Sequence, residues 1–128
     1  MTDIIQDAEI FVKTKLRKQN QRGEWKIDLT TSQIRKFLSS VNKIDNRMLT
    51  EKDVLSPDII NEIKYLKIML AYQTGRAGKL GKGTNPLEPL YEDLIPKIDA
   101  IADSKKKFIE FARYVEAIVA YHKFYGGN

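Results

Sequence analysis

The sequence predicts an all-α fold, a compact bundle of about five helices. Apolar residues recur at helical spacing along the chain, and no stretch alternates apolar and polar residues with enrichment in β-branched types. At 128 residues, 42% hydrophobic and 30% charged, the chain has the size and composition of one globular domain. We therefore expect a single helical domain over residues 1–128, without strands.

The first helix is expected from about Thr2 to Asn20. Its acidic residues precede its basic residues, an order that the helix macrodipole favours. The residues predicted to face the core are Ile5, Ala8, Val12 and Leu16.

The second helix begins at the clearest local signal in the chain, the capping box Thr30-Thr-Ser-Gln33, and is expected to run to about Lys43. Leu29 and Ile34 occupy the two positions of a hydrophobic staple. Trp25 is expected to pack under the start of this helix, with stacking on a nucleic-acid base as the alternative.

The third helix is predicted over residues 57–74. Ser56 is its expected N-cap, Pro57 its first residue and Gly75 its stop signal. Apolar residues cover it almost all round, so it should be central to the bundle or docked on a partner.

The last two helices are predicted over residues 87–102 and from Ser104 to about Phe124. Pro96 should kink or split the earlier one. Ser104 is the expected cap of the later one, and Gly126-Gly127 should stop it.

The charge is unevenly distributed. The net charge is +5, with +3 in residues 26–44, +3 in residues 73–85 and −4 in residues 86–103. A basic balance of this kind suits a polyanionic partner. The absence of cysteine excludes disulfides and thiolate metal sites, and the acidic N-terminus and short apolar runs predict a cytoplasmic protein with no membrane partner.

Residues 73–85, QTGRAGKLGKGTN, hold four glycines and three cations. A phosphate-binding Walker loop needs a lysine after its last glycine, but Thr84 follows Gly83 here. Gly78 to Gly81 has the G-x-x-G form of a KH loop, yet that module needs a sheet. Two interpretations stay open: a flexible solvated connector, or a basic loop that orders on a phosphate backbone.

No catalytic, metal or cofactor site is expected. His122 is the only histidine and falls on the predicted core stripe of the last helix, where a satisfied core residue is the favoured interpretation over a general base. The paired Glu-x-x-His motifs of a di-metal bundle are missing.

Three stretches carry a family resemblance. These are Leu29-Thr-Thr-Ser-Gln-Ile-Arg-Lys-Phe-Leu38, Leu66-Lys-Ile-Met-Leu-Ala-Tyr-Gln-Thr-Gly-Arg76, and the segment from Phe111 to Gly127 that contains EAIVAYHKFYGG. In this order and spacing they resemble the small helical subunit of the type III-A CRISPR (Csm) effector complex. The resemblance implies a non-catalytic subunit that stacks with other copies of itself and with other Csm subunits along the guide (CRISPR) RNA and target RNA. It would stabilise bound target and help to monitor complementarity in antiviral defence.

The resemblance also implies an RNA-binding surface. The motif cations are Arg35, Lys36, Lys67, Arg76 and Lys123. Charge placement adds Lys43, Arg47, Lys64, Lys79 and Lys82. The alternative is a protein-only helical adaptor, which would dock a partner through Tyr114, Tyr121 and the third helix.

Overall fold

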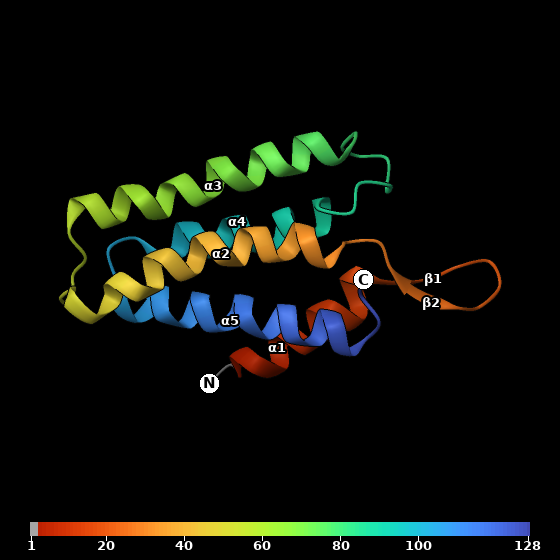
Figure 1. Ribbon diagram of the computed structural model, residues 1–128, viewed down its shortest axis with the longest axis horizontal. Coiled ribbons are helices and arrows are strands. Elements are labelled where there is room, and N and C mark those ends of the chain that lie inside the picture. Colours follow the sequence, from red (N-terminus) through yellow and green to blue (C-terminus); the bar gives the residue numbers. More distant parts are fainter. Residues whose placement is uncertain (1–2) are drawn as a thin grey trace.

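A computed structural model describes residues 3–128 and has four helices that run alternately up and down. Each of these helices packs against two neighbours, so that α2, α3, α4 and α5 form a closed ring (Figure 1). They are α2 (Thr31–Arg47), α3 (Pro57–Ala77), α4 (Glu88–Ile101) and α5 (Lys105–Phe124). A fifth helix, α1 (Ile4–Phe11), packs on α5 and continues as a π-helical turn, η1 (Val12–Leu16). The predicted all-α fold of about five helices is confirmed.

The start of α2 confirms the predicted capping box. The amide of Gln33 donates to Thr30 Oγ1 at 3.1 Å, and the amide of Thr30 donates to Gln33 Oε1 at 2.9 Å. The helix extends one turn beyond the predicted end, to Arg47, because Ile44 and Met48 continue its buried stripe. The short 3-10 turn η2 (Met48–Thr50) follows.

The predicted end of α3 at Gly75 is wrong. Gly75 lies inside the helix with open space around it, and the chain leaves the helix only after Ala77, at Gly78 with φ 146°. Pro57 is the first residue as predicted, but the Ser56 side chain makes no capping hydrogen bond.

Of the kink or split predicted at Pro96, the split is wrong, because helix α4 runs unbroken through this residue. Proline removes the hydrogen bond to the carbonyl four residues earlier, at Glu92. Both residues are exposed, so water can satisfy that carbonyl. The cap predicted for α5 is confirmed, because the amide of Lys107 donates to Ser104 Oγ at 3.2 Å.

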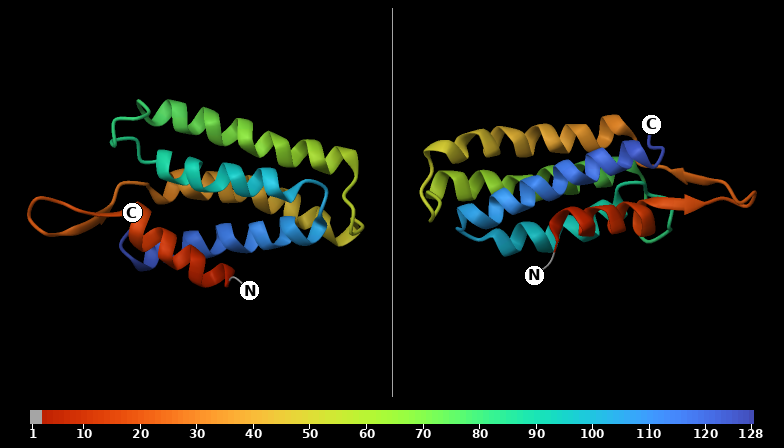
Figure 2. Two further views of the ribbon diagram at one scale, coloured as in Figure 1. Left: turned by 180° about the vertical axis from the view of Figure 1, so that it is seen from behind. Right: turned by 90° about the horizontal axis from the view of Figure 1, so that it is seen from below.

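A β-hairpin replaces the predicted end of the first helix, and the expectation of no strands is wrong. Strand β1 (Arg17–Gln19) pairs antiparallel with β2 (Trp25–Ile27). Asn20 forms the turn by accepting the amides of Arg22 and Glu24 with its side-chain oxygen. The hairpin projects from the end of the bundle beside the C-terminus (Figures 1 and 2).

Two predicted core positions near this region also differ. Ile5 is exposed because the buried stripe of α1 passes through Ala8 and Phe11 instead. Trp25 does not pack under α2, since its side chain is 55% exposed on the hairpin; Ile27 and Leu29 fill that space. Thr2, where the first helix was expected to begin, lies outside the described residues.

Candidate nucleic-acid interface

One end of the bundle concentrates the positive charge. The hairpin, the start of α2, the loop after α3 and the C-terminus of α5 lie together there (Figure 2). We call this region, residues 13–36, 76–88 and 121–128, the hairpin end. It holds twelve Lys and Arg against three Asp and Glu, whereas the remainder of the chain holds ten against fourteen. The hairpin end therefore produces a positive field that attracts polyanions.

A groove between α2 and α3 brings two predicted cations together. It has a volume of about 310 Å³ and is lined by Gln33, Lys36, Tyr72, Gln73 and Arg76, among others. Its helices are joined across the groove by Gln73 Nε2, which donates to the Gln33 carbonyl at 3.0 Å. Among residues 3–128 no carboxylate lies within salt-bridge distance of Lys36 or Arg76. We call this feature the α2–α3 groove.

A second hollow of about 390 Å³ lies further along the same two helices. Lys43, Arg47, Glu62 and Tyr65 help to line it. Arg47 Nη1 is 2.6 Å from Glu62 Oε1, so its charge is already balanced. Lys43 forms no ion pair with any residue that the structure describes.

The remaining predicted cations are scattered. Arg35 is exposed, but it directly precedes the groove residue Lys36, lies about 100° from it around α2, and does not line the groove. Lys67 Nζ is 2.6 Å from Asp99 Oδ1 and so lies on the α4 side of α3. Lys64 is exposed. The hairpin end thus collects six of the ten predicted residues: Arg35, Lys36, Arg76, Lys79, Lys82 and Lys123.

A buried asparagine anchors the loop between α3 and α4, residues 78–87, which we call the Gly/Lys loop. Asn85 Nδ2 donates to the carbonyls of Thr74 at 2.8 Å and Gly78 at 3.0 Å, and Asn85 Oδ1 accepts the Leu87 amide at 2.9 Å. Glu88 also accepts the amide of Gly81 at 2.9 Å. The loop is therefore tied to the end of α3 and the start of α4, while Lys79 and Lys82 stay exposed. The sequence analysis did not identify Asn85, although an asparagine before a proline is a turn signal.

The hairpin contributes cations that the sequence analysis assigned to a helix. Lys18 Nζ donates to the Gly83 carbonyl at 3.3 Å, which joins β1 to the Gly/Lys loop. Arg17 lies in the same strand. The overlooked signal was the turn residue Asn20 followed by Gly23, which adopts φ 81°.

His122 is a structural residue, as expected. It is 1% exposed, and its Nε2 lies 2.5 Å from the Leu29 carbonyl oxygen. Gly127 packs against the imidazole so closely that a side chain there would overlap it. The EAIVAYHKFYGG motif therefore fixes the C-terminus of α5 to the segment that leads into α2.

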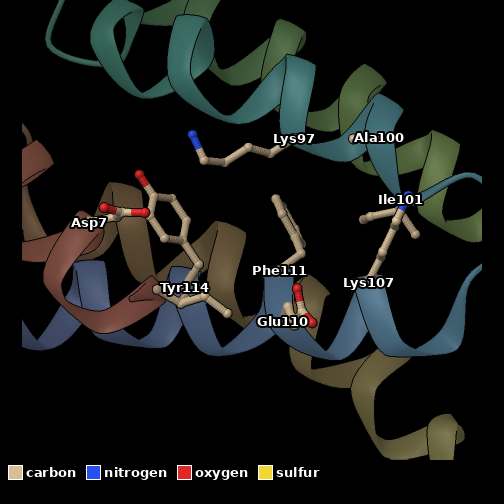
Figure 3. A pocket seen from close by; sticks show the side chains of 9 residues that line it. Asp7, Lys97, Ala100, Ile101, Lys107, Glu110, Phe111 and Tyr114 are labelled. Atoms are coloured by element: carbon tan, nitrogen blue, oxygen red, sulfur yellow. The ribbon is translucent and has the colours of Figure 1, made fainter. Parts of the chain in front are cut away.

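A separate cavity of about 270 Å³ lies between α1, the end of α4 and the start of α5 (Figure 3). Asp7, Glu110, Lys97 and Lys107 line it, so its charges balance. Tyr114 points toward it and donates to Asp93 Oδ2 at 2.6 Å. Burial, followed by this hydrogen bond, raises the pKa of the Tyr114 hydroxyl far above its ordinary value of 10.0. The phenol stays neutral, and the cavity offers no basic site for a polyanion.

Residues 3–128 contain no cluster of three or more His, Asp or Glu side chains placed to hold a metal ion. No helix among them combines the length and apolarity needed to cross a membrane.

The fold and this surface define a small all-α protein with one strongly basic end. A family model described as Csm2 Type III-A matches residues 11–128, and the chain belongs to this family. It is 33% identical to the CRISPR system protein Csm2 of Enterococcus italicus over 123 residues, covering 92% of this chain and 86% of that protein. It is 38% identical to the Csm2 protein of Streptococcus thermophilus over 105 residues, covering 78% and 75%. A Csm2 protein of Mycobacterium tuberculosis is 26% identical over 123 residues, covering 95% and 90%.

These matches confirm the resemblance to the small helical subunit of the type III-A CRISPR effector complex. Other Csm subunits are therefore its partners.

Proposed function

We propose that this protein is a non-catalytic RNA-binding subunit that stacks along the paired guide and target RNA in the cytoplasm. It would stabilise bound target and help to monitor complementarity. The observation that carries the proposal is the concentration of twelve cations at the hairpin end. Among them, Lys36 and Arg76 line the α2–α3 groove and form no ion pair with residues 3–128.

The chemistry of the groove suits a nucleic-acid backbone. A guanidinium can bind two phosphate oxygens at once, and a lysine adds a mobile point charge. Because A-form duplexes hide their base edges in a deep major groove, contacts of this kind read shape and charge rather than sequence. The same surface can therefore serve any guide sequence.

Stacking of copies is supported by the uneven charge. The chain outside the hairpin end has more acids than bases, so it can face the basic end of a neighbouring copy. On α4, Glu92 is exposed, while Asp93 is engaged by Lys97 and Tyr114. Glu92→Lys therefore tests this contact without breaking the bonds that Asp93 makes. We expect stacking of copies and the yield of the complex to fall, and unchanged values of both would count against this contact.

The RNA assignment is tested in the assembled complex with Arg35→Ala plus Arg76→Ala. We expect assembly with the other subunits to persist and target-RNA retention to fall. Lys52→Ala plus Lys106→Ala removes the same charge from exposed positions outside the hairpin end and is the matched control. Full target retention by the Arg35 and Arg76 variant would reject the assigned surface.

The protein-only adaptor remains the second candidate because α3 exposes an apolar row. Tyr65, Ile68 and Tyr72 are 64%, 59% and 65% exposed. Tyr114 cannot serve this role as predicted, since its side chain is buried. Ultraviolet absorbance of the purified complex before and after ribonuclease treatment separates the candidates. If this subunit is an adaptor that contacts only protein, the complex that it holds together should lose no nucleic-acid absorbance on treatment.

A further inference from the structure

The hairpin displays an aromatic ring with a cation stacked on it. Trp25 is 55% exposed on β2, and Arg17 Cζ lies 4.5 Å from the centre of its ring. The same guanidinium carbon lies 5.0 Å from the ring centre of Tyr125 at the end of α5. Arg17 therefore holds the indole against the bundle and leaves much of its surface open to solvent.

Packing does not account for the exposure of this indole. Trp25 and Ile27 are two residues apart on one strand and so share a face of the hairpin. Ile27 is 7% exposed and belongs to the core, whereas Trp25, at the other end of β2, is 55% exposed. A small polar residue at position 25 would meet the needs of the fold.

The surroundings of the ring are positive and polar. No carboxylate of residues 3–128 lies within salt-bridge distance of Arg17, and its Nε is buried without a hydrogen-bond partner. Lys18 is exposed in the neighbouring strand, and Lys79 and Lys82 lie in the loop that Lys18 contacts. The same guanidinium contacts Tyr125, and the 75% exposed Phe124 lies edge-on to Tyr125 with ring centres 5.0 Å apart, so cations and aromatic rings alternate here. A nucleotide offers both a flat base for the ring and a phosphate for the cations.

We infer that Trp25 stacks on an unpaired base of single-stranded RNA, while the cations of the hairpin and of the Gly/Lys loop hold the adjacent phosphates. This inference rests on the proposed function and extends it, because the α2–α3 groove serves a duplex backbone and the hairpin serves an unpaired nucleotide. Arg17 acts as a positioning residue that fixes the orientation of the indole.

Trp25 is the only tryptophan in the chain, so the intrinsic fluorescence of the unmodified protein reports on this ring alone. Three probes of equal length are titrated at low salt: single-stranded oligoadenylate, the abasic oligomer with the same phosphates, and a blunt RNA duplex. We expect oligoadenylate to quench the emission strongly. The abasic oligomer and the duplex should bind, as measured by anisotropy of a label on the RNA, with little quenching.

Variants test the same point through affinity. Trp25→Ala should weaken oligoadenylate binding at least about fivefold and leave abasic binding unchanged, since stacking contributes about 1–3 kcal/mol per base. Trp25→Phe should retain part of the affinity. Leu49→Ala, which alters a 91% exposed apolar side chain outside the hairpin end, is the control and should change neither.

Equal affinity for the abasic and adenylate oligomers, with no quenching, would overturn the stacking inference and leave the duplex function standing. Quenching by a protein subunit of the complex but not by oligoadenylate would also overturn it and would assign the ring to a protein contact. Failure of all three RNA probes to bind would reject both the inference and the proposed function.

Discussion

His122 donates its Nε2 hydrogen to the carbonyl oxygen of Leu29 across 2.5 Å, and both residues are buried. A carbonyl can only accept, so Nε2 must carry a proton. The bond joins the last turn of α5 to the segment between the hairpin and α2. The backbone amide of Thr31 donates to the Asn128 carbonyl beside it. The geometry of the basic hairpin end therefore depends on this junction.

Replacement of the buried imidazole should destabilise the fold. His122→Ala removes the donor to Leu29 and leaves a cavity, and we expect a loss of about 2–4 kcal/mol in the free energy of unfolding. The adjacent Lys123→Ala, at an exposed position, should change it by less than about 0.5 kcal/mol. Urea unfolding followed by circular dichroism measures both; equal midpoints would show that the imidazole is dispensable.

Two glycines should respond in opposite directions to the same substitution. A Cβ at Gly127 would overlap the His122 ring, so Gly127→Ala should cost about 1–3 kcal/mol. Gly75 lies within α3 with nothing near its would-be Cβ, so Gly75→Ala should stabilise by about 0.5–1 kcal/mol. Thermal unfolding midpoints that shifted the same way would contradict the assigned helix boundary or the C-terminal packing.

Loss of the Asn85 anchor should free the Gly/Lys loop. Asn85→Ala deletes the bonds to Thr74, Gly78 and Leu87, so the loop should open more often. Limited trypsin digestion measures this opening as faster cleavage after Lys79 and Lys82. Thr84→Ala, at an exposed loop position, is the control. If cleavage of the Asn85 variant kept the wild-type rate, the loop would not be held by this side chain.

The buried phenol of Tyr114 predicts a loss of stability at alkaline pH. Tyrosine ionises near pH 10.0 in the unfolded chain, but burial and the bond to Asp93 raise the pKa of folded Tyr114 above that value. The stabilisation is complete below pH 10 and declines as the pH rises above it. Tyr114→Phe should lower stability at pH 8 by about 1 kcal/mol and flatten the decline above pH 10.

The control for this pH dependence is Tyr72→Phe, whose phenol is 65% exposed. It should keep the alkaline decline of the wild-type protein. An unchanged decline in the Tyr114→Phe variant would mean that the decline arises elsewhere in the chain.

Local signals in the sequence predicted most of the helices. Three of these signals act within one helical turn: the Thr30–Gln33 capping box, Pro57 and the Ser104 cap. Neighbouring residues are therefore enough to predict where α2, α3 and α5 begin. The end of α3 was missed because Asn85, eleven residues after Thr74, helps to fix it. The hairpin was missed because residues 17–19 continue a helical pattern, and only pairing with residues 25–27 makes them a strand.

The candidate site was predictable as a set of cations but not as a surface. Ion pairs between residues distant in the sequence decide which charges stay free, as with Arg47 and Glu62 or Lys67 and Asp99. The groove position of Lys36 beside Arg76 depends on the register of α2 against α3. The exposure of Trp25 likewise follows from the projection of the hairpin.

The most direct measurement of RNA binding at the hairpin end is the salt dependence of affinity for a duplex RNA. Each phosphate contact contributes roughly 0.7–0.9 to the slope of log K against log salt concentration. Lys36→Ala plus Arg76→Ala should therefore reduce the slope by about 1.4–1.8 and weaken binding at every salt concentration. Lys52→Ala plus Lys106→Ala, which removes the same charge elsewhere, should leave the slope unchanged. Equal slopes for the wild-type protein and the Lys36 and Arg76 variant would contradict the assignment of this surface to RNA.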